Sequence, residues 1–250
     1  MKRATLDALV AAQESRARRV RVVSLSTGNE ALIAEPSELS ELEEAEFAAH
    51  EPKLAEVVAK VLAGDRGRLV QIDSDSDSIS DSGAADAPSF FVHPFNPRPR
   101  LIIVGAVHIA QRLARLALGL GYDVLVIDPR RGFLTESRFP GVARSHEWPD
   151  VAVESAGLDG RSALVALSHD PKIDQPALEV ALRSDCFYIG ALGSQRTQAK
   201  RRARLAELGF DEAALARIHG PVGLDIGASS PAEIALSIAA ELTECLRKRA

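Results

Sequence analysis

The sequence predicts an α/β protein in which a parallel sheet with helices on both faces follows a small α/β N-terminal domain. The first indication is the apolar run 101–104, which leads into a glycine turn at Gly105 and then into helical periodicity over 108–120. A second apolar run, 124–128, ends in a carboxylate. Beyond these runs strand and helix patterns continue to alternate, as is typical of a parallel sheet with right-handed crossovers.

The stretch from 101 to Asp128 has the form of the βαβ unit that opens a Rossmann-like, dinucleotide-type fold. In such a unit phosphates rest on the helix N-terminus, and the acid that closes the second strand contacts a ribose. Val107 stands where the pattern has its second glycine. A branched side chain there is expected to keep a diphosphate away from the backbone amides. A doubly wound fold that binds no nucleotide is the alternative.

The N-terminal domain is predicted over residues 1–72. Its elements are a helix, a hairpin around Gly28-Asn29, two exposed helices rich in Glu and Ala, and a short strand. In that order they cover 4–18, 20–25 with 31–34, 37–48, 52–63 and 69–72.

Residues 73–99 are predicted to form an acidic, serine-rich linker followed by an extended connector. The stretch 73–82 alternates Asp and Ser and has too little apolar surface to fold. It is not a calcium loop, because Ser78 and Ala84 stand where glycine and glutamate are required. The prolines within 90–99 cannot continue a hydrogen-bonded ladder, which favours a connector into the domain 100–250.

Composition excludes several classes of protein. The chain has 250 residues, 46% of them hydrophobic, and a net charge of −5, which gives no basic field for nucleic acid. No apolar run is long enough to span a membrane and no signal segment is evident, so we expect a cytoplasmic protein. Cys186 and Cys245 have no zinc-ligand spacing and are expected to be buried and inert.

Several loops are expected to meet at one rim of the sheet, outside the carboxyl ends of its strands. The remaining predicted elements are strands at 163–167 and 186–190 and helices at 174–183, 195–208 and 231–247. The turn from Gly190 to Thr197 carries glycines and hydroxyls, and such turns present free N–H groups to anions. Arg196, Lys200 and Arg201 lie on about the first turn of the helix that it opens, although cations near a helix start oppose the helix dipole. A helix capped by Ser194 with solvated basic residues is an equal alternative.

Two further segments close the rim. Asp225 lies between Gly223 and Gly227 in an enforced turn, ahead of a capping box from Ser230 to Glu233. His169 is expected to be a rim contact rather than a base or metal ligand, because adjacent strand residues point in opposite directions. No nucleophile elbow, metal-binding helix or paired-cysteine motif is present.

These loops together resemble the XdhC/CoxI family, the accessory proteins of xanthine dehydrogenase and related molybdenum hydroxylases. The resemblance covers roughly residues 90–248 and is strongest in Tyr188-Ile-Gly-Ala-Leu-Gly-Ser194 and in Gly220-Pro-Val-Gly-Leu-Asp-Ile-Gly227. It extends to Pro99-Arg-Leu-Ile-Ile-Val-Gly-Ala106, Val126-Ile-Asp-Pro-Arg130 and Ser168-His-Asp-Pro171.

The resemblance implies a Rossmann-like C-terminal domain that binds the molybdenum cofactor, a pterin with a phosphate tail often extended by a nucleotide. It implies help in sulfurating that cofactor and inserting it into a xanthine dehydrogenase or CO dehydrogenase type hydroxylase, so a carrier rather than a catalyst. A cysteine desulfurase and a second copy of the chain are further partners consistent with it. The cofactor-binding residues it implies are Gly105, Ala106, His108, Asp128, His169, Gly190, Gly193, Ser194, Arg196 and Asp225, with no metal ligand.

The chain departs from the family pattern at Val107, where members carry glycine, and in lacking the Ser-Gly-Gly-Cys-x-Glu segment of the N-terminal domain. Two other functions therefore stay open. One is an NAD(P)-dependent oxidoreductase that uses the same βαβ unit. The other is a partner protein of the hydroxylase that binds no small molecule.

Overall fold

The computed structural model describes residues 1–42, 45–72, 79–80 and 88–248. They form two compact units, Met1–Pro97 and Arg98–Lys248. Each unit has its own sheet and its own hydrophobic core.

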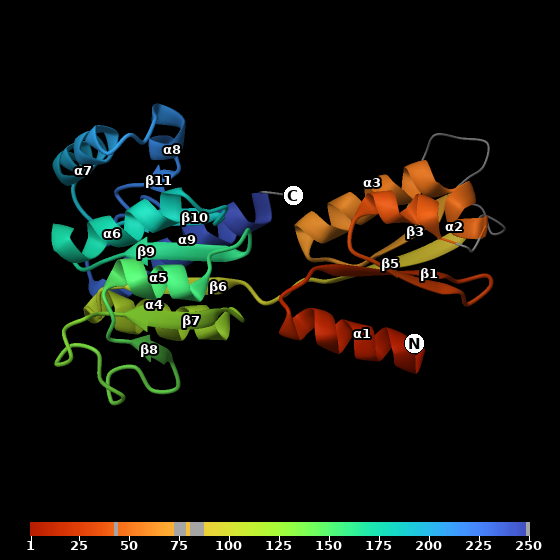
Figure 1. Ribbon diagram of the computed structural model, residues 1–250, viewed down its shortest axis with the longest axis horizontal. Coiled ribbons are helices and arrows are strands. Elements are labelled where there is room, and N and C mark those ends of the chain that lie inside the picture. The colour runs from red at the N-terminus through yellow and green to blue at the C-terminus, as the bar shows by residue number, and fades with distance from the viewer. Residues whose placement is uncertain (43–44, 73–78, 81–87, 249–250) are drawn as a thin grey trace. The chain divides into compact units, whose positions relative to one another are not determined.

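The N-terminal unit is a mixed α/β unit built on an antiparallel sheet with strand order β2-β1-β5-β3-β4. Helices α2 and α3 lie on one side of this sheet and α1 on the other (Figure 1). Its elements are α1 (Arg3–Glu14), β1 (Arg19–Ser24), β2 (Glu30–Ile33), the 3-10 helix η1 (Pro36–Glu41), α2 (Ala45–Ala49), α3 (Glu51–Gly64), β3 (Arg68–Ile72), β4 (Ile79–Ser80) and β5 (Ser89–Phe95).

The helices predicted to be exposed at 37–48 and 52–63 are in fact the cover of this core. In α3 the residues Leu54, Val57, Val58 and Val61 are at most 1% exposed. Their spacing places them on one face of the helix, packed against the strands. The prediction of exposure was wrong: Glu and Ala are abundant in these helices, but the apolar stripe alone determines which face is buried.

The extended connector predicted within residues 73–99 is also corrected. Ser89–Phe95 is the middle strand of the sheet and pairs with both β1 and β3. Pro94 is tolerated because β3 pairs only with Ser89 to Val92, so the proline has a neighbouring strand on one side alone. Of the predicted linker, residues 73–78 and 81–87 lie outside the described residues.

The C-terminal unit confirms the predicted fold class. Six parallel strands have the order β11-β10-β9-β6-β7-β8, which is the Rossmann arrangement, with helices on both faces. Its elements are β6 (Arg100–Val104), α4 (His108–Gly119), β7 (Asp123–Ile127), β8 (Ala143–Ser145), α5 (Pro149–Ala156), β9 (Ser162–Ala166), α6 (Pro171–Leu182), β10 (Tyr188–Ala191), α7 (Gln195–Glu207), α8 (Glu212–Ala216), β11 (Ile218–His219) and α9 (Pro231–Lys248).

Alternate residues of the central strand β6 serve two cores. Leu101 and Ile103 pack with α4 and α9 on one face, while Ile102 and Val104 pack with α5 and α6 on the other. This is why the run 101–104 is apolar without interruption. The sequence prediction missed β8, α5, α8 and β11, which are short and have weak apolar periodicity.

None of the helices within the described part of the chain has the length and apolar character needed to cross a bilayer.

Candidate functional site

The candidate site is the rim of the C-terminal unit's sheet, at the carboxyl ends of its parallel strands. The chain leaves β6 towards β7 and β8 on one side, and later continues through β9, β10 and β11 on the other. The strand order therefore reverses between β6 and β9, and open α/β sheets bind ligands at such a point.

At the reversal point the loop after β6 touches the loop after β9. Gly105 has φ +100°, and a Cβ added there would lie 2.6 Å from the backbone nitrogen of Ser168. Glycine is required at 105 because two backbones approach closely and because the conformation is left-handed. The predicted binding glycine thus has a packing partner within the fold.

Asp128, the predicted ribose-contacting acid, binds within the chain. Its side chain is fully buried. One carboxylate oxygen accepts a 2.7 Å hydrogen bond from the Ala106 amide. The backbone and guanidinium of Arg130 donate three more, at 2.7 to 3.0 Å. Burial would raise the pKa of this carboxyl, but the hydrogen bonds from Arg130 and Ala106 outweigh it and lower the pKa below its ordinary value.

The loop after β9 is organised by a second buried carboxylate, which sequence analysis missed. Asp174 lies in the first turn of α6 and is 2% exposed. Its Oδ1 accepts hydrogen bonds from the amide of Ser168 at 3.1 Å and from the hydroxyl at 2.6 Å. Asp170 caps the same helix by accepting from the Lys172 amide. His169, between Ser168 and Asp170 in the sequence, is exposed and has a left-handed backbone conformation with φ +63°.

The loop after β10 begins α7 as a capped helix start. The Ser194 hydroxyl accepts from the Thr197 amide at 3.4 Å. Gln198 is buried and donates to the Ala191 carbonyl at 2.8 Å. Arg201 donates to the Leu192 carbonyl at 3.1 Å, so α7 is tied to the end of β10 from two successive turns.

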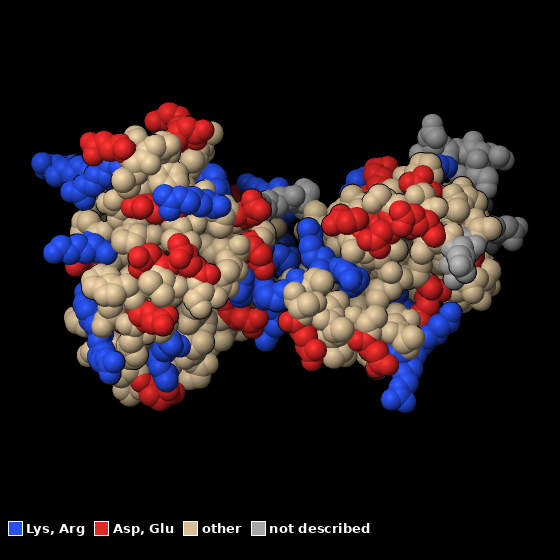
Figure 2. Space-filling model, viewed as in Figure 1, with Lys and Arg blue, Asp and Glu red and all other residues tan. Residues whose placement is uncertain are grey.

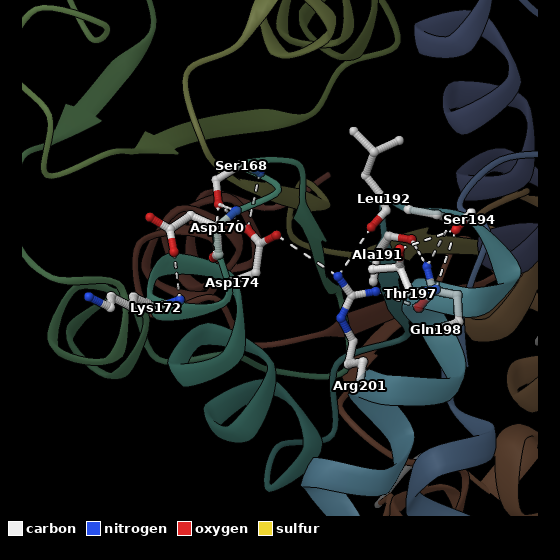
Figure 3. A network of polar contacts seen from close by, with 11 residues as sticks. Ser168, Asp170, Lys172, Asp174, Ala191, Leu192, Ser194, Thr197, Gln198 and Arg201 are labelled. Carbon is white, nitrogen blue, oxygen red and sulfur yellow. Dashed lines mark hydrogen bonds and ion pairs between the residues drawn. The ribbon is translucent and has the colours of Figure 1, made fainter.

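A hollow of about 240 Å³ lies between the starts of α6 and α7. Figure 3 shows Asp174 from α6 and Arg201 from α7 pointing towards one another in this region. Basic side chains dominate the lining, and Figure 2 shows blue side chains gathered where Figure 1 places α7. The lining residues are His169, Pro171, Asp174, Gln175, Thr197, Lys200, Arg201 and Arg204.

A second hollow, of about 490 Å³, lies on the other side of the α7 start. It contains Asp225, which is exposed, together with Gln195 of α7 and Leu192. Its remaining lining comes from the loop Pro221 to Ala228 and from Ile234 and Ser237 of α9.

Below that loop, Glu241 of α9 ties three elements together. It accepts from the Tyr188 hydroxyl and from the Gly223 amide, and it pairs with Nδ1 of His219 at 2.9 Å. Cys245 lies 4.0 Å from the other His219 nitrogen and is only partly buried, contrary to the prediction for this cysteine. Cys186 is buried as predicted.

The predicted site residues are therefore distributed over the rim rather than gathered in one pocket. His169 lines the smaller hollow and Asp225 the larger, whereas Arg196 is exposed and lines neither. Gly190 lies inside β10, where a Cβ would meet Val222 and Tyr188. His108 is exposed at the first residue of α4, while Gly193 and Ser194 form the turn before α7.

Sequence reasoning missed Asp174, Thr197 and Arg204. The spacing of Thr197, Lys200 and Arg204 could have revealed one face of α7, since residues three, four and seven apart share a helix face. Asp174 had no such signal, because its role depends on the loop that folds over it.

The chain is similar to known proteins in sequence and in fold. Residues 101–242 match the family described as the XdhC Rossmann domain. The molybdenum cofactor insertion chaperone PaoD of Escherichia coli is 35% identical over 148 residues, 59% of this chain and 40% of PaoD. A protein of Bacillus subtilis described as a probable xanthine dehydrogenase subunit is 33% identical over 162 residues, 64% of this chain and 47% of that protein. YqeB of Escherichia coli is 33% identical over 178 residues, 71% of this chain and 32% of YqeB.

The chain thus spans about a third to a half of the length of these curated relatives. A crystal structure of a xanthine dehydrogenase from Bacillus halodurans superposes with a TM-score of 0.71 at 24% identity, over 99% of this chain and 68% of that one. At that identity the likeness concerns the fold.

Proposed function

The chain belongs to the XdhC family, as the sequence resemblance predicted, and from this we propose that it binds the molybdenum cofactor and helps to insert it into a molybdenum hydroxylase of the xanthine dehydrogenase or CO dehydrogenase type. The name of PaoD, a molybdenum cofactor insertion chaperone, supports this proposal. Assistance with sulfuration, through contact with a cysteine desulfurase, is part of it.

The observation that carries the proposal is the pair of hollows on either side of the first turn of α7. The cofactor is a pterin with a phosphate tail, so it needs an anion site and a site for a flat ring with N–H donors. The smaller hollow provides cations from Lys200, Arg201 and Arg204. The larger provides an exposed carboxylate, Asp225, that can accept from the ring's N–H groups, within a largely apolar lining.

The residues named from the family resemblance enter this proposal in different ways. Gly193 and Ser194 shape the turn that begins α7, while His169 in the smaller hollow and Asp225 in the larger contact ligand. Ala106 and Asp128 hold the rim together instead of touching ligand, because they are bonded to one another and Asp128 is also bonded to Arg130. Gly105 has the same structural role, because its amide donates to the Ile127 carbonyl and its Cα lies against Ser168.

That bonding argues against an NAD(P)-dependent oxidoreductase. A dinucleotide site needs the turn amides for the pyrophosphate and the acid for a ribose hydroxyl. Here the Ala106 amide donates to the Asp128 carboxylate. The two groups that would hold the dinucleotide satisfy each other.

The test is to identify what the purified protein releases. Wild-type protein is produced in cells that make molybdenum cofactor and denatured, and released pterins are quantified by mass spectrometry. Asp225→Asn is expected to retain about fivefold less pterin than wild type, because a charged acceptor is lost. Asp185→Asn is the matched control. This carboxylate is also exposed but precedes β10, so it lies at the amino ends of the strands and not at the rim formed by their carboxyl ends.

If wild-type protein releases no pterin but captures an apo-hydroxylase in a pull-down, the cofactor-carrier function is wrong. The chain would then be a partner protein of the hydroxylase that binds no ligand. Release of NAD or NADP would favour the oxidoreductase.

A further inference from the structure

The smaller hollow contains a buried acceptor that the fold leaves unsatisfied. Oδ1 of Asp174 receives two hydrogen bonds from Ser168, but Oδ2 has no hydrogen-bond partner among the described residues. Buried carboxylate oxygens are nearly always hydrogen-bonded, so an orphaned one indicates a missing donor.

The nearest cation stands at a distance that suits a bridging atom. Nη2 of Arg201 lies 3.9 Å from Oδ2 of Asp174, too far for a direct hydrogen bond (Figure 3). A single oxygen atom can lie about 2.7–2.9 Å from both, since such hydrogen bonds close a triangle over this separation. That oxygen has to carry a proton for Asp174 and accept one from Arg201.

The charge of the hollow favours an anion. Lys200, Arg201 and Arg204 line it, and only one carboxylate, Asp174, opposes them. Lys200 and Arg204 are one turn apart on the same face of α7, so they repel each other. An anion between α6 and α7 would relieve that repulsion.

We propose that this hollow is a phosphomonoester site in which a protonated phosphoryl oxygen bridges Asp174 and Arg201 while Lys200 and Arg204 neutralise the remaining charge. The Thr197 hydroxyl and the His169 ring, which also line the hollow, border the same group. The inference rests on the proposed function, because the phosphate of the cofactor is its intended occupant, and it moves that phosphate away from Arg196.

Asp174 makes the site selective. A carboxylate acceptor binds a phosphoryl group that keeps a proton and rejects an oxyanion that has none. Inorganic phosphate always carries a proton near neutral pH, and about half of a phosphomonoester carries one at about pH 6, whereas sulfate carries none. The hollow should therefore prefer phosphate to sulfate, although the two ions have the same shape.

The first experiment titrates purified protein at about pH 6 with inorganic phosphate and with a small alkyl phosphomonoester, by calorimetry. Lys200→Gln and Arg204→Gln should each weaken binding of both probes at least about fivefold, since each removes one charge from the anion. Both side chains are exposed, so the variants are expected to fold. Arg115→Gln, an exposed cation on α4, is the matched control and should bind as wild type does.

The second experiment measures selectivity. Wild-type protein should bind phosphate about tenfold more tightly than sulfate, because sulfate leaves the Asp174 acceptor unpaired. Asp174→Asn keeps an acceptor for Ser168 and turns an N–H₂ donor to the hollow, so it should bind the two ions within about twofold of each other. Circular dichroism and a denaturant titration establish that this variant folds. If it does not, the phosphate preference of wild type alone decides the matter.

Equal binding of phosphate and sulfate by wild type would overturn the role of Asp174. A larger loss from Arg196→Gln than from Lys200→Gln and Arg204→Gln would overturn the site itself. Failure here is separable from failure of the proposed function. If the Lys200→Gln, Arg204→Gln double variant retains as much pterin as wild type, the phosphate site is wrong but the proposed cofactor-carrier function is still supported. If phosphate binds as described but no pterin is released, the proposed cofactor-carrier function is wrong and the phosphate site is still supported.

Discussion

The backbone amide of Ala106, in the turn after β6, donates a 2.7 Å hydrogen bond to the buried carboxylate of Asp128 at the end of β7. These are the positions from which a Rossmann fold holds a pyrophosphate and a ribose. In this chain they hold each other. This hydrogen bond links the turn after β6 to the end of β7 within the first βαβ unit. The groups left to bind ligand therefore lie at the other side of the rim, near β9, β10 and α7.

Asp128→Asn is expected to lower the free energy of unfolding by about 2–3 kcal/mol. The substitution keeps the shape of the side chain but removes the charge that pairs with Arg130, and it leaves a buried amide among donors. Asp123→Asn, at the exposed start of the same strand, should change stability by less than about 0.5 kcal/mol. Denaturant titrations of both variants make the comparison, and similar losses would contradict the fastening role.

The same carboxylate predicts a dependence of stability on pH. Its folded pKa lies below the ordinary 3.8, so the folded state binds this proton less readily than the unfolded state. The stabilisation is fully present above 3.8 and is lost as pH falls through the folded pKa. The stability difference between wild type and Asp128→Asn should be constant from about pH 7 to 5 and narrow below about pH 4. A constant difference down to about pH 3 would show that Asp128 does not titrate in this way.

Sequence could predict the sheet because burial on both faces leaves a local trace. The runs 101–104, 124–127 and 163–167 are apolar throughout, and glycines mark the turns that follow or precede them. Arg196 was predicted as a ligand contact for a comparable local reason, its place at a helix start. The sequence could not predict contacts between loops and helices that are distant along the chain. Examples are the close approach of Ser168 to Gly105 and the proximity of Asp174 on α6 to Arg201 on α7.

The N-terminal unit illustrates the same limit. Strand β5 contains a proline and is followed by two more, so its local pattern indicated a connector. Its partners β1 and β3 lie far away in sequence, and the pairing that makes it the middle strand leaves no local signal.

Gly105→Ala should be far more harmful than alanine at a comparable glycine. Both Gly105 and Gly121 have positive φ, so each substitution costs about 1 kcal/mol in backbone strain. Only at 105 would the new Cβ collide with the backbone of Ser168, which adds about 2 kcal/mol or more. Thermal or denaturant unfolding of the two variants measures the difference. Equal destabilisation would mean that the loops after β6 and β9 are free to separate.

Tyr188 should resist ionisation as long as the protein is folded. Burial, together with the negative charge of Glu241, raises the pKa of this phenol well above its ordinary 10.0. The neutral phenol is therefore favoured in the fold, and its contribution to stability is lost as pH rises above 10.0. In an absorbance titration of tyrosinate, wild type and Tyr188→Phe should give the same signal until the protein unfolds. An additional tyrosinate in folded wild-type protein near pH 10 would contradict this.

The variant Val107→Gly tests whether the turn after β6 can bind a diphosphate once the valine side chain is removed. Val107 is the residue that departs from the family glycine, and on sequence grounds its removal would open the turn to a diphosphate. In the structure its side chain packs against the core of the C-terminal unit, and its amide donates to the Gly105 carbonyl at 3.0 Å. Because the amides of Ala106 and Val107 are both engaged, the glycine variant should lose about 1–2 kcal/mol of stability and gain no affinity for ADP. Val107→Ala, which loses most of the packing but keeps the backbone preference, should be intermediate in stability and equally indifferent to ADP. A gain of about tenfold or more in ADP affinity with Val107→Gly would mean that the valine blocks a working phosphate loop, and the ligand would then belong at the reversal between β6 and β9.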